Sequence, residues 1–301
     1  MNYDELSMFR ENAEEAGIPW RGTPAVERIH ADLPGGRKLS GLAWGQSPPE
    51  IVFFHGGAQN AHTWDTVALA LDLPLLALDL PGHGHSDWRD DGRYDPVENA
   101  HALAHAVETL APEAGLIVGM SLGGLSASVL ASKRPDLVAR LLLVDVTPGV
   151  TAGKAKAVID FVTGPLEFES FDEILARTLE HNPTRSESSL RRGILHNARE
   201  LESGRWSWRY DRRRFTQRDE ARRDEDPGGF FGDLWDHVSN IQARVMLCRG
   251  ALSPVVDDAD VAEFLRRQPE TRVEVVEGAG HSIQGDRPLE LAALIRDFRG
   301  A

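Results

Sequence analysis

The sequence of 301 residues has a single cysteine, Cys248, so no disulfide can form within the chain. It also lacks the C-x-x-C and Cys/His spacings of zinc sites, so we expect no structural metal. The residues before Cys248 are Val245, Met246 and Leu247, which predicts a buried strand thiol rather than a reactive one. Without disulfide or metal, the fold has to rest on a hydrophobic core, and a chain of this length can bury a large one.

Long apolar runs are absent as well. No stretch approaches the roughly 18 apolar residues of a membrane-spanning helix. The first residues, Met1–Glu5, are acidic and lack the basic and apolar regions of a signal peptide. With 41% hydrophobic and 27% charged residues, the composition is that of an ordinary globular protein. We therefore expect a cytoplasmic protein without a membrane partner.

Basic residues are in deficit, with 33 Lys and Arg against 47 Asp and Glu and a formal net charge of −14. This charge argues against nucleic acid and anionic membranes as partners. Basic and aromatic residues do mix over Arg205–Tyr210, a pattern that can bind single-stranded nucleic acid. Because of the net charge, we expect these aromatic residues to pack instead. The net charge says little about the substrate, and the sequence leaves the oligomeric state open.

Short apolar runs alternate with helix-like segments along most of the chain, which predicts a parallel sheet with helices on both faces. A turn at Pro34–Gly36 indicates that the first two strands form a hairpin. We expect a mostly parallel eight-stranded sheet. Its strands are predicted at residues 26–31, 38–44, 51–54, 75–78, 114–118, 141–146, 245–248 and 272–276.

The alternation stops at about residue 148 and resumes at about residue 241. The intervening residues are charged and aromatic and show no clear buried strand, so we expect an all-helical cap at 148–240. Residues 1–147 and 241–301 would then form the core domain. The aromatic residues of the expected cap are Trp206, Trp208, Tyr210, Phe215, Phe230, Phe231 and Trp235.

One stretch has the pattern G-x-S-x-G, from Gly119 to Gly123, with Ser121 at its centre. It lies between an apolar strand and a small-residue helix, the context that a nucleophile elbow requires. Such a turn brings neighbouring backbones close together, and glycine avoids the Cβ clash. The sequence therefore predicts Ser121 as a nucleophile. The alternative is a small-residue turn that happens to contain serine.

A serine nucleophile needs a general base and hydrogen-bond donors for the oxyanion. Of the eleven histidines, His281 stands out because it follows the last predicted strand in a glycine-rich loop. The expected oxyanion donors are the backbone N–H groups of Leu122 and Gly57, with Ala58 as the alternative to Gly57. We expect His55 to shape its loop rather than transfer protons.

These motifs together resemble the α/β-hydrolase fold family. The resemblance rests on Phe54–Gly57, Asp79–Ser86, Gly119–Gly124 and Gly278–His281, which occur in the family's order. It implies an α/β-hydrolase fold with an inserted cap, with Ser121, His281 and the oxyanion positions carried over one by one. It implies no cofactor.

The acid partner of His281 departs from the common pattern of that family. The usual Gly-x-x-Asp after the cap reads Gly250-Ala251-Leu252-Ser253 here, and serine supplies no carboxylate. Asp145 ends the strand after the elbow helix, where haloalkane dehalogenases and certain lactone hydrolases of the family carry the acid. A carboxylate that closes an apolar strand is costly unless it is paired. We predict Asp145 as the acid, with Asp257 or Asp258 as the alternative.

Three tryptophans are candidates for substrate contacts. Trp64 follows the expected oxyanion loop, and Trp206 and Trp208 belong to the expected cap. Two histidines, His101 and His105, have the i, i+4 spacing of a helical metal site. They lack the intervening glutamate of that motif, so we expect a packed or solvated helix face and no metal.

The sequence thus predicts a serine hydrolase that cleaves an ester or lactone of a fairly apolar small molecule through an acyl-enzyme. A serine nucleophile argues against epoxide hydrolases and haloalkane dehalogenases, which need a carboxylate there. Two alternatives remain open: hydrolysis of a carbon–carbon bond in a diketone-like substrate, and a ligand-binding homologue with low turnover.

Overall fold

A computed structural model of the chain describes residues 3–213 and 231–300. These residues form an eight-stranded sheet in the order β1-β2-β4-β3-β5-β6-β10-β11. Strand β2 is antiparallel to β1 and β4, and the other neighbouring strands pair in parallel, as predicted. The strands are β1 (Val26–Asp32), β2 (Lys38–Trp44), β3 (Ile51–Phe54), β4 (Leu75–Leu78), β5 (Leu116–Met120), β6 (Arg140–Val144), β10 (Arg244–Gly250) and β11 (Arg272–Val276).

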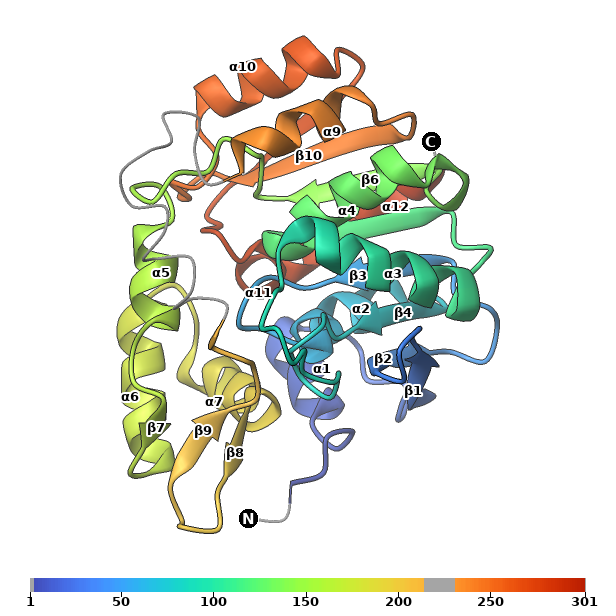
Figure 1. The fold of residues 1–301 in the computed structure, drawn as a ribbon. Coiled ribbons are helices and arrows are strands. Elements are labelled where there is room, and N and C mark those ends of the chain that lie inside the picture. Colours follow the sequence, from blue (N-terminus) through green and yellow to red (C-terminus); the bar gives the residue numbers. More distant parts are fainter. Residues whose placement is uncertain (1–2, 214–230, 301) are drawn as a thin grey trace.

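Helices cover both faces of this sheet (Figure 1). Successive side chains of a strand point to opposite faces, and in β3 Val52 and Phe54 join one core cluster while Ile51 and Phe53 join the other. The first cluster is covered by α3 (Pro96–Leu110), α4 (Leu122–Lys133), α9 (Trp235–Ser239) and α10 (Asp258–Arg267). The second is covered by α1 (Phe9–Ala16), α2 (Asp65–Leu71), α11 (Ile283–Asp286) and α12 (Pro288–Gly300).

Local sequence signals explain where several elements begin. The turn at Pro34–Gly36 joins β1 to β2, whose register pairs Asp32 with Lys38. Helix α3 starts at Pro96, and the Asp95 side chain caps it by accepting from the N–H groups of the next turn. Short 3-10 segments also occur in the connections, at η1 (Ala61–Trp64), η2 (Pro135–Leu137) and η3 (Gly232–Leu234).

The lone cysteine lies in the core, as expected. Cys248 on β10 is fully buried. Burial raises the pKa of its thiol to about 12, so the thiol stays protonated and unreactive at neutral pH. Within the described part of the chain, no helix combines the length and apolar character needed to cross a membrane.

A second group of elements lies beside the large sheet (Figure 1). It contains the helices α5 (Lys156–Val162), α6 (Phe171–His181) and α7 (Glu187–Asn197). It also contains a three-stranded antiparallel sheet of β7 (Glu167–Phe168), β9 (Trp206–Trp208) and β8 (Ala198–Glu200). We call these six elements the cap. The expectation of an all-helical segment is wrong.

The aromatic residues explain the small sheet. Trp206 and Trp208 alternate with Ser207, and both indole side chains are buried in the core of the cap. This spacing has the period of a strand, which places both rings on one face. Trp235, by contrast, packs in a hydrophobic cluster of the large sheet. Two further aromatic residues of the expected cap, Phe215 and Phe230, lie outside the described residues, and the domain boundaries stay a prediction.

Candidate active site

Ser121 occupies a sharp turn between β5 and α4. Its backbone has φ 50° and ψ −121°, a conformation that a residue with a side chain rarely adopts. The turn brings backbones into close contact, because a Cβ atom added to Gly123 would lie 2.5 Å from the carbonyl oxygen of Phe54. A Cβ atom on Gly119 would lie 2.6 Å from the Cα of Gly124. The strand, turn and helix predicted around Ser121 are therefore present.

His281 and Asp145 are in direct contact. The Nδ1 atom of His281 lies 2.7 Å from Oδ2 of Asp145. Asp145 is completely buried, and its carboxylate also accepts from the N–H of Gly250 at 2.9 Å and from Oγ of Ser253 at 2.6 Å. Three donors thus compensate the cost of burying this carboxylate and fix its orientation.

A glycine allows the histidine loop to approach β10. A Cβ atom added to Gly250 would lie 2.2 Å from the carbonyl oxygen of Gly280. On its other side the loop is held by Asp286, whose Oδ2 accepts from the N–H of Gly280 at 2.8 Å. The two contacts place His281 over the ends of β6 and β10, next to Asp145.

The alternative acids are engaged elsewhere. Asp257 forms a capping box with Asp260 at the start of α10, and its carboxylate lies 2.9 Å from Nζ of Lys154. Asp258 is exposed and pairs with Arg249. Of the carboxylates weighed from the sequence, only Asp145 contacts His281.

The role of Ser253 is one that the sequence reasoning missed. Ser253 occupies the position where the family usually has its acid, and it donates a hydrogen bond to the carboxylate that takes over. The sequence did contain a signal, because the residue that replaces the usual acid is a hydroxyl donor. Its hydrogen bond to Asp145 could not be predicted without knowing that β6 pairs with β10, which brings Asp145 next to Ser253.

The loop after β3 provides backbone N–H groups near the elbow. The N–H of Ala58 donates to Nε2 of His83 at 3.2 Å, which leaves Gly57 as the better oxyanion donor of the two. Leu122 is the first residue of α4, where helix geometry leaves N–H groups without an intrahelical partner. His55 accepts from the N–H of Leu80 at 2.9 Å and so supports the loop.

The three candidate tryptophans are all buried. Trp64 has no exposed surface, and its ring centroid lies 4.8 Å from that of Phe53 in the core below the sheet, which does not support the predicted substrate contact. Trp206 packs edge-on against Phe171 within the cap. Trp208 also belongs to this cap core, but it reaches the cavity described next.

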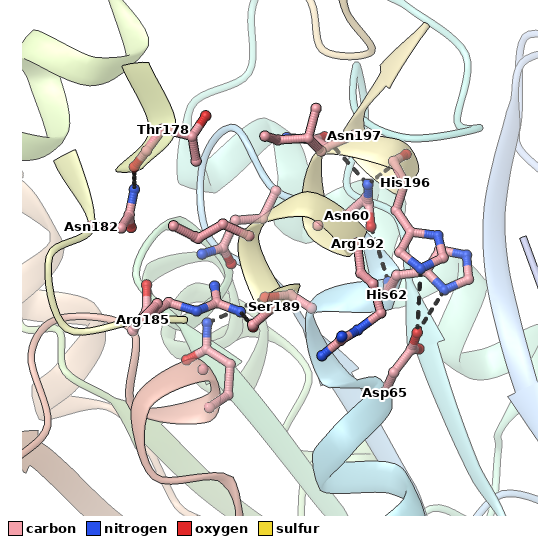
Figure 2. A pocket seen from close by; sticks show the side chains of 18 of the residues that line it. Asn60, His62, Asp65, Thr178, Asn182, Arg185, Ser189, Arg192, His196 and Asn197 are labelled. Carbon is pink, nitrogen blue, oxygen red and sulfur yellow. Dashed lines mark hydrogen bonds and ion pairs between the residues drawn. The ribbon is translucent and has the colours of Figure 1, made fainter. Parts of the chain in front are cut away.

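A cavity of about 160 Å³ lies between the cap and the core (Figure 2). It is lined by the loop after β3, by the residues after His281 and by α7, so it lies beside the loops that contain Gly57 and His281. Ser121 and His281 do not line it themselves. Its polar lining includes Asn60, Asn182, Arg185, Ser189, Arg192 and Gln284.

A second histidine–aspartate contact borders this cavity. His62 Nδ1 lies 2.9 Å from Asp65, and Nε2 lies 3.2 Å from Glu5. Burial opposes a charge on His62, but the two carboxylates outweigh it and raise the pKa of the ring to about 9. The ring of His196 stacks on His62 at 3.7 Å, and burial together with the charge of His62 lowers the pKa of His196 well below its usual value.

His62, Asp65 and His196 also offer atoms within 4.8 Å of one another, close enough to ligate a metal ion. Their surroundings argue against a cation, because both nitrogens of His62 contact carboxylates and the Arg28 guanidinium lies 3.5 Å from Nε2. The carboxylates of Glu5 and Asp65 thus already lie against the positive charges of Arg28 and His62. We therefore describe the group as an ion-pair network.

Comparison with known proteins agrees with this fold. The model described as "Alpha/beta hydrolase family" matches residues 51–294, so the chain belongs to the α/β-hydrolase family. Esterase Rv0045c of Mycobacterium tuberculosis is 45% identical over 97% of this chain and 95% of the esterase. A structure of that esterase, from work on its inhibition by transition metals, aligns over 100% of both chains with a TM-score of 0.87 and 44% identity. The mouse sn-1-specific diacylglycerol lipase ABHD11 is 28% identical over 83% of this chain and 80% of the lipase.

Proposed function

We propose that this protein is a carboxylic ester hydrolase in which Ser121, His281 and Asp145 form the catalytic triad. His281 takes the proton of the Ser121 hydroxyl as it attacks the ester carbonyl and returns that proton to the leaving alcohol. Water, activated by the same histidine, then cleaves the acyl-enzyme. The N–H groups of Leu122 and Gly57 stabilise the oxyanion in both steps.

The contact of 2.7 Å between His281 and Asp145 carries this proposal. A carboxylate on Nδ1 selects the tautomer whose Nε2 can accept a proton, and it stabilises the imidazolium that forms. The strained turn at Ser121 and the glycines that permit it give a second, independent support. Nearly full-length similarity to an esterase supports the reaction class.

The proposal is tested with a fluorophosphonate probe and a panel of 4-nitrophenyl esters, lactones and diketones. The wild-type protein is expected to react with the probe and to hydrolyse esters, and Ser121→Ala is expected to abolish both. Ester hydrolysis that persists in Ser121→Ala would contradict the proposal. Labelling without turnover of any ester or lactone would favour a ligand-binding role, and cleavage of diketones alone would favour carbon–carbon bond hydrolysis.

A further inference from the structure

Two arginines line the cavity beside the catalytic loops, and their surroundings differ (Figure 2). The Nε atom of Arg192 donates to Asn12 at 2.7 Å, and its Nη2 atom pairs with Glu15. Arg185 donates to Oγ of Ser189, while its Nε atom is buried without a partner. Within residues 3–213 and 231–300, no carboxylate lies within ion-pair distance of Arg185. The cavity thus contains one compensated and one uncompensated guanidinium.

The guanidinium of Arg185 packs against the backbone that follows His281. A Cβ atom added to Gly285 would lie 2.9 Å from the Cζ atom of Arg185, so the guanidinium lies directly against the backbone there. The nearby Asp286 is occupied, because its carboxylate accepts from the N–H of Gly280 at 2.8 Å and from Oγ1 of Thr184 at 3.1 Å. Burial lowers the pKa of Arg185, and the more distant Asp286 and Glu15 oppose that effect.

An unpaired cation is costly inside a protein, and it is tolerated where a ligand supplies the missing charge. We propose that Arg185 binds a carboxylate of the substrate, so that the preferred substrates are esters that carry a second, free carboxyl group. This inference rests on the proposed ester hydrolysis at Ser121. It adds a specificity-determining contact to that reaction.

The geometry of the cavity fits this class of ligand. Ala58 lies beside the oxyanion donor Gly57, and Ser282 lies beside His281, and both line the cavity. The cavity thus borders the two loops that hold the expected oxyanion donor and His281, which is where a substituent of the reacting ester would lie. Two oxygens of a carboxylate match the planar guanidinium fork. The single uncompensated charge of Arg185 balances one carboxylate, whereas a phosphate group would bring a charge of about −1.5 to −2.

Gln284 supplies a second polar group at the same cavity. Its Oε1 atom is buried without a donor among the described residues, and its Nε2 atom has only a long contact of 3.4 Å to Thr63. Rotating this amide by half a turn exchanges its two polar atoms, so an NH2 donor takes the place of the unpartnered Oε1 in the wall that Gln284 shares with Arg185.

The test compares pairs of esters that differ only in charge. Monoethyl glutarate and ethyl pentanoate have the same chain length, and the malonate, succinate and adipate monoesters extend the series. We expect the wild-type enzyme to have a higher kcat/KM for at least one monoester than for its neutral partner. In Arg185→Gln, kcat/KM for that monoester should fall about 10- to 100-fold, the range for a hydrogen bond to a charged group. The value for the neutral ester should stay within about twofold.

Arg191→Gln is the matched control. Arg191 lies on α7, is exposed and stacks over the ring of Phe171 at 4.8 Å, and it does not line the cavity. This variant removes the same charge and should leave both esters unchanged. Arg185→Gln should melt at the wild-type temperature or above it, because it removes a half-buried charge that has no ion-pair partner among the described residues. A lower melting temperature with equal losses for both esters would assign Arg185 a structural role and overturn the inference.

Binding is measured separately from turnover by titrating glutarate into the Ser121→Ala protein in a calorimeter. We expect binding that Arg185→Gln weakens by the same 10- to 100-fold. Absence of binding, or binding that Arg185→Gln leaves unchanged, overturns the inference even if neutral esters are hydrolysed. Binding through Arg185 in a protein that hydrolyses no ester would instead leave the carboxylate site in place and refute the proposed function.

Discussion

Among the described residues, two hydrogen bonds between a histidine and an aspartate have nearly the same length. His281 lies 2.7 Å from Asp145 and His62 lies 2.9 Å from Asp65. The histidines differ in access, because the side chain of His281 is 16% exposed and that of His62 is 2% exposed. They also differ in the second ring nitrogen, which in His62 contacts a further carboxylate, Glu5.

This difference indicates that a second carboxylate beside His62 suits it for an ion pair rather than for proton transfer. His62 has two carboxylate partners and stays charged, so it cannot act as a base at neutral pH. It joins the N-terminal segment through Glu5, and it stacks on His196, whose Nδ1 lies 2.7 Å from the hydroxyl of Tyr3. His281 has one carboxylate, and neutral donors from Gly250 and Ser253 share that charge.

Replacing each of the two aspartates by asparagine is the test of this comparison with the largest expected effect. Asp145→Asn should lower kcat by about 10⁴-fold, because the amide stabilises the wrong tautomer of His281. Asp65→Asn, assayed below its melting temperature, should keep most of the turnover and lose stability instead. The measurement is kcat for a 4-nitrophenyl ester together with the melting temperature of each variant.

Asp257→Asn is the control for this pair, since Asp257 only caps α10 and contacts Lys154. Its kcat should stay near the wild-type value. A large loss in Asp257→Asn with little loss in Asp145→Asn would refute the assignment of the acid.

Removing the charged histidine His62 should have the next largest effect, a loss in the free energy of unfolding. His62→Gln leaves Asp65 buried without its cation, and breaking a buried pair in this way costs about 3 to 5 kcal/mol. The free energy of unfolding from urea titration measures this loss. If the variant unfolds at the wild-type urea concentration, the pair contributes no stability and the contrast with His281 disappears.

The pH dependence of stability is a smaller test of the same pair. The pKa of His62 is raised from about 6.5 in the unfolded chain to about 9 in the folded one. Its contribution is therefore complete below pH 6.5 and is lost as the pH rises through 9, about 2 kcal/mol between pH 7 and pH 9. The stability difference between wild type and His62→Gln should shrink over that range. A difference that is constant from pH 7 to 9 would contradict the charged state of His62.

Sequence reasoning worked where a short pattern carries its own geometric requirement. Ser121 and His281 stand in glycine-rich turns after β5 and β11, and these strands run in the same direction and end at the same edge of the sheet. Asp145 was predicted from an acid position that some branches of the family use and from the cost of an unpaired carboxylate at the end of an apolar strand, and the structure places three donors around this carboxylate.

The failures concern properties that depend on distant parts of the chain. The strands of the cap span two or three residues, too few for a periodicity to register against the surrounding helices. Trp64 follows the oxyanion loop, but the turn at η1 directs its ring into the core. The uncompensated charge of Arg185 depends on where Glu15 and Asp286 lie in the fold, and no local pattern records that.

Ser253 provides the smallest and most specific test of the comparison. Its hydroxyl gives Asp145 a neutral donor in a place where Asp65 has none, because Oδ1 of Asp65 is buried without a partner among the described residues. Ser253→Ala leaves the carboxylate with the N–H of Gly250 and with His281, so the carboxylate gains freedom to rotate. One lost hydrogen bond to a charged group costs about 1.5 kcal/mol, or about tenfold in kcat, and KM should not change. Ser253→Thr keeps the hydroxyl and should restore most of kcat. If Ser253→Ala instead has wild-type kcat, the position of Asp145 is fixed by Gly250 and His281 alone, and the neutral hydroxyl has no part in distinguishing the two pairs.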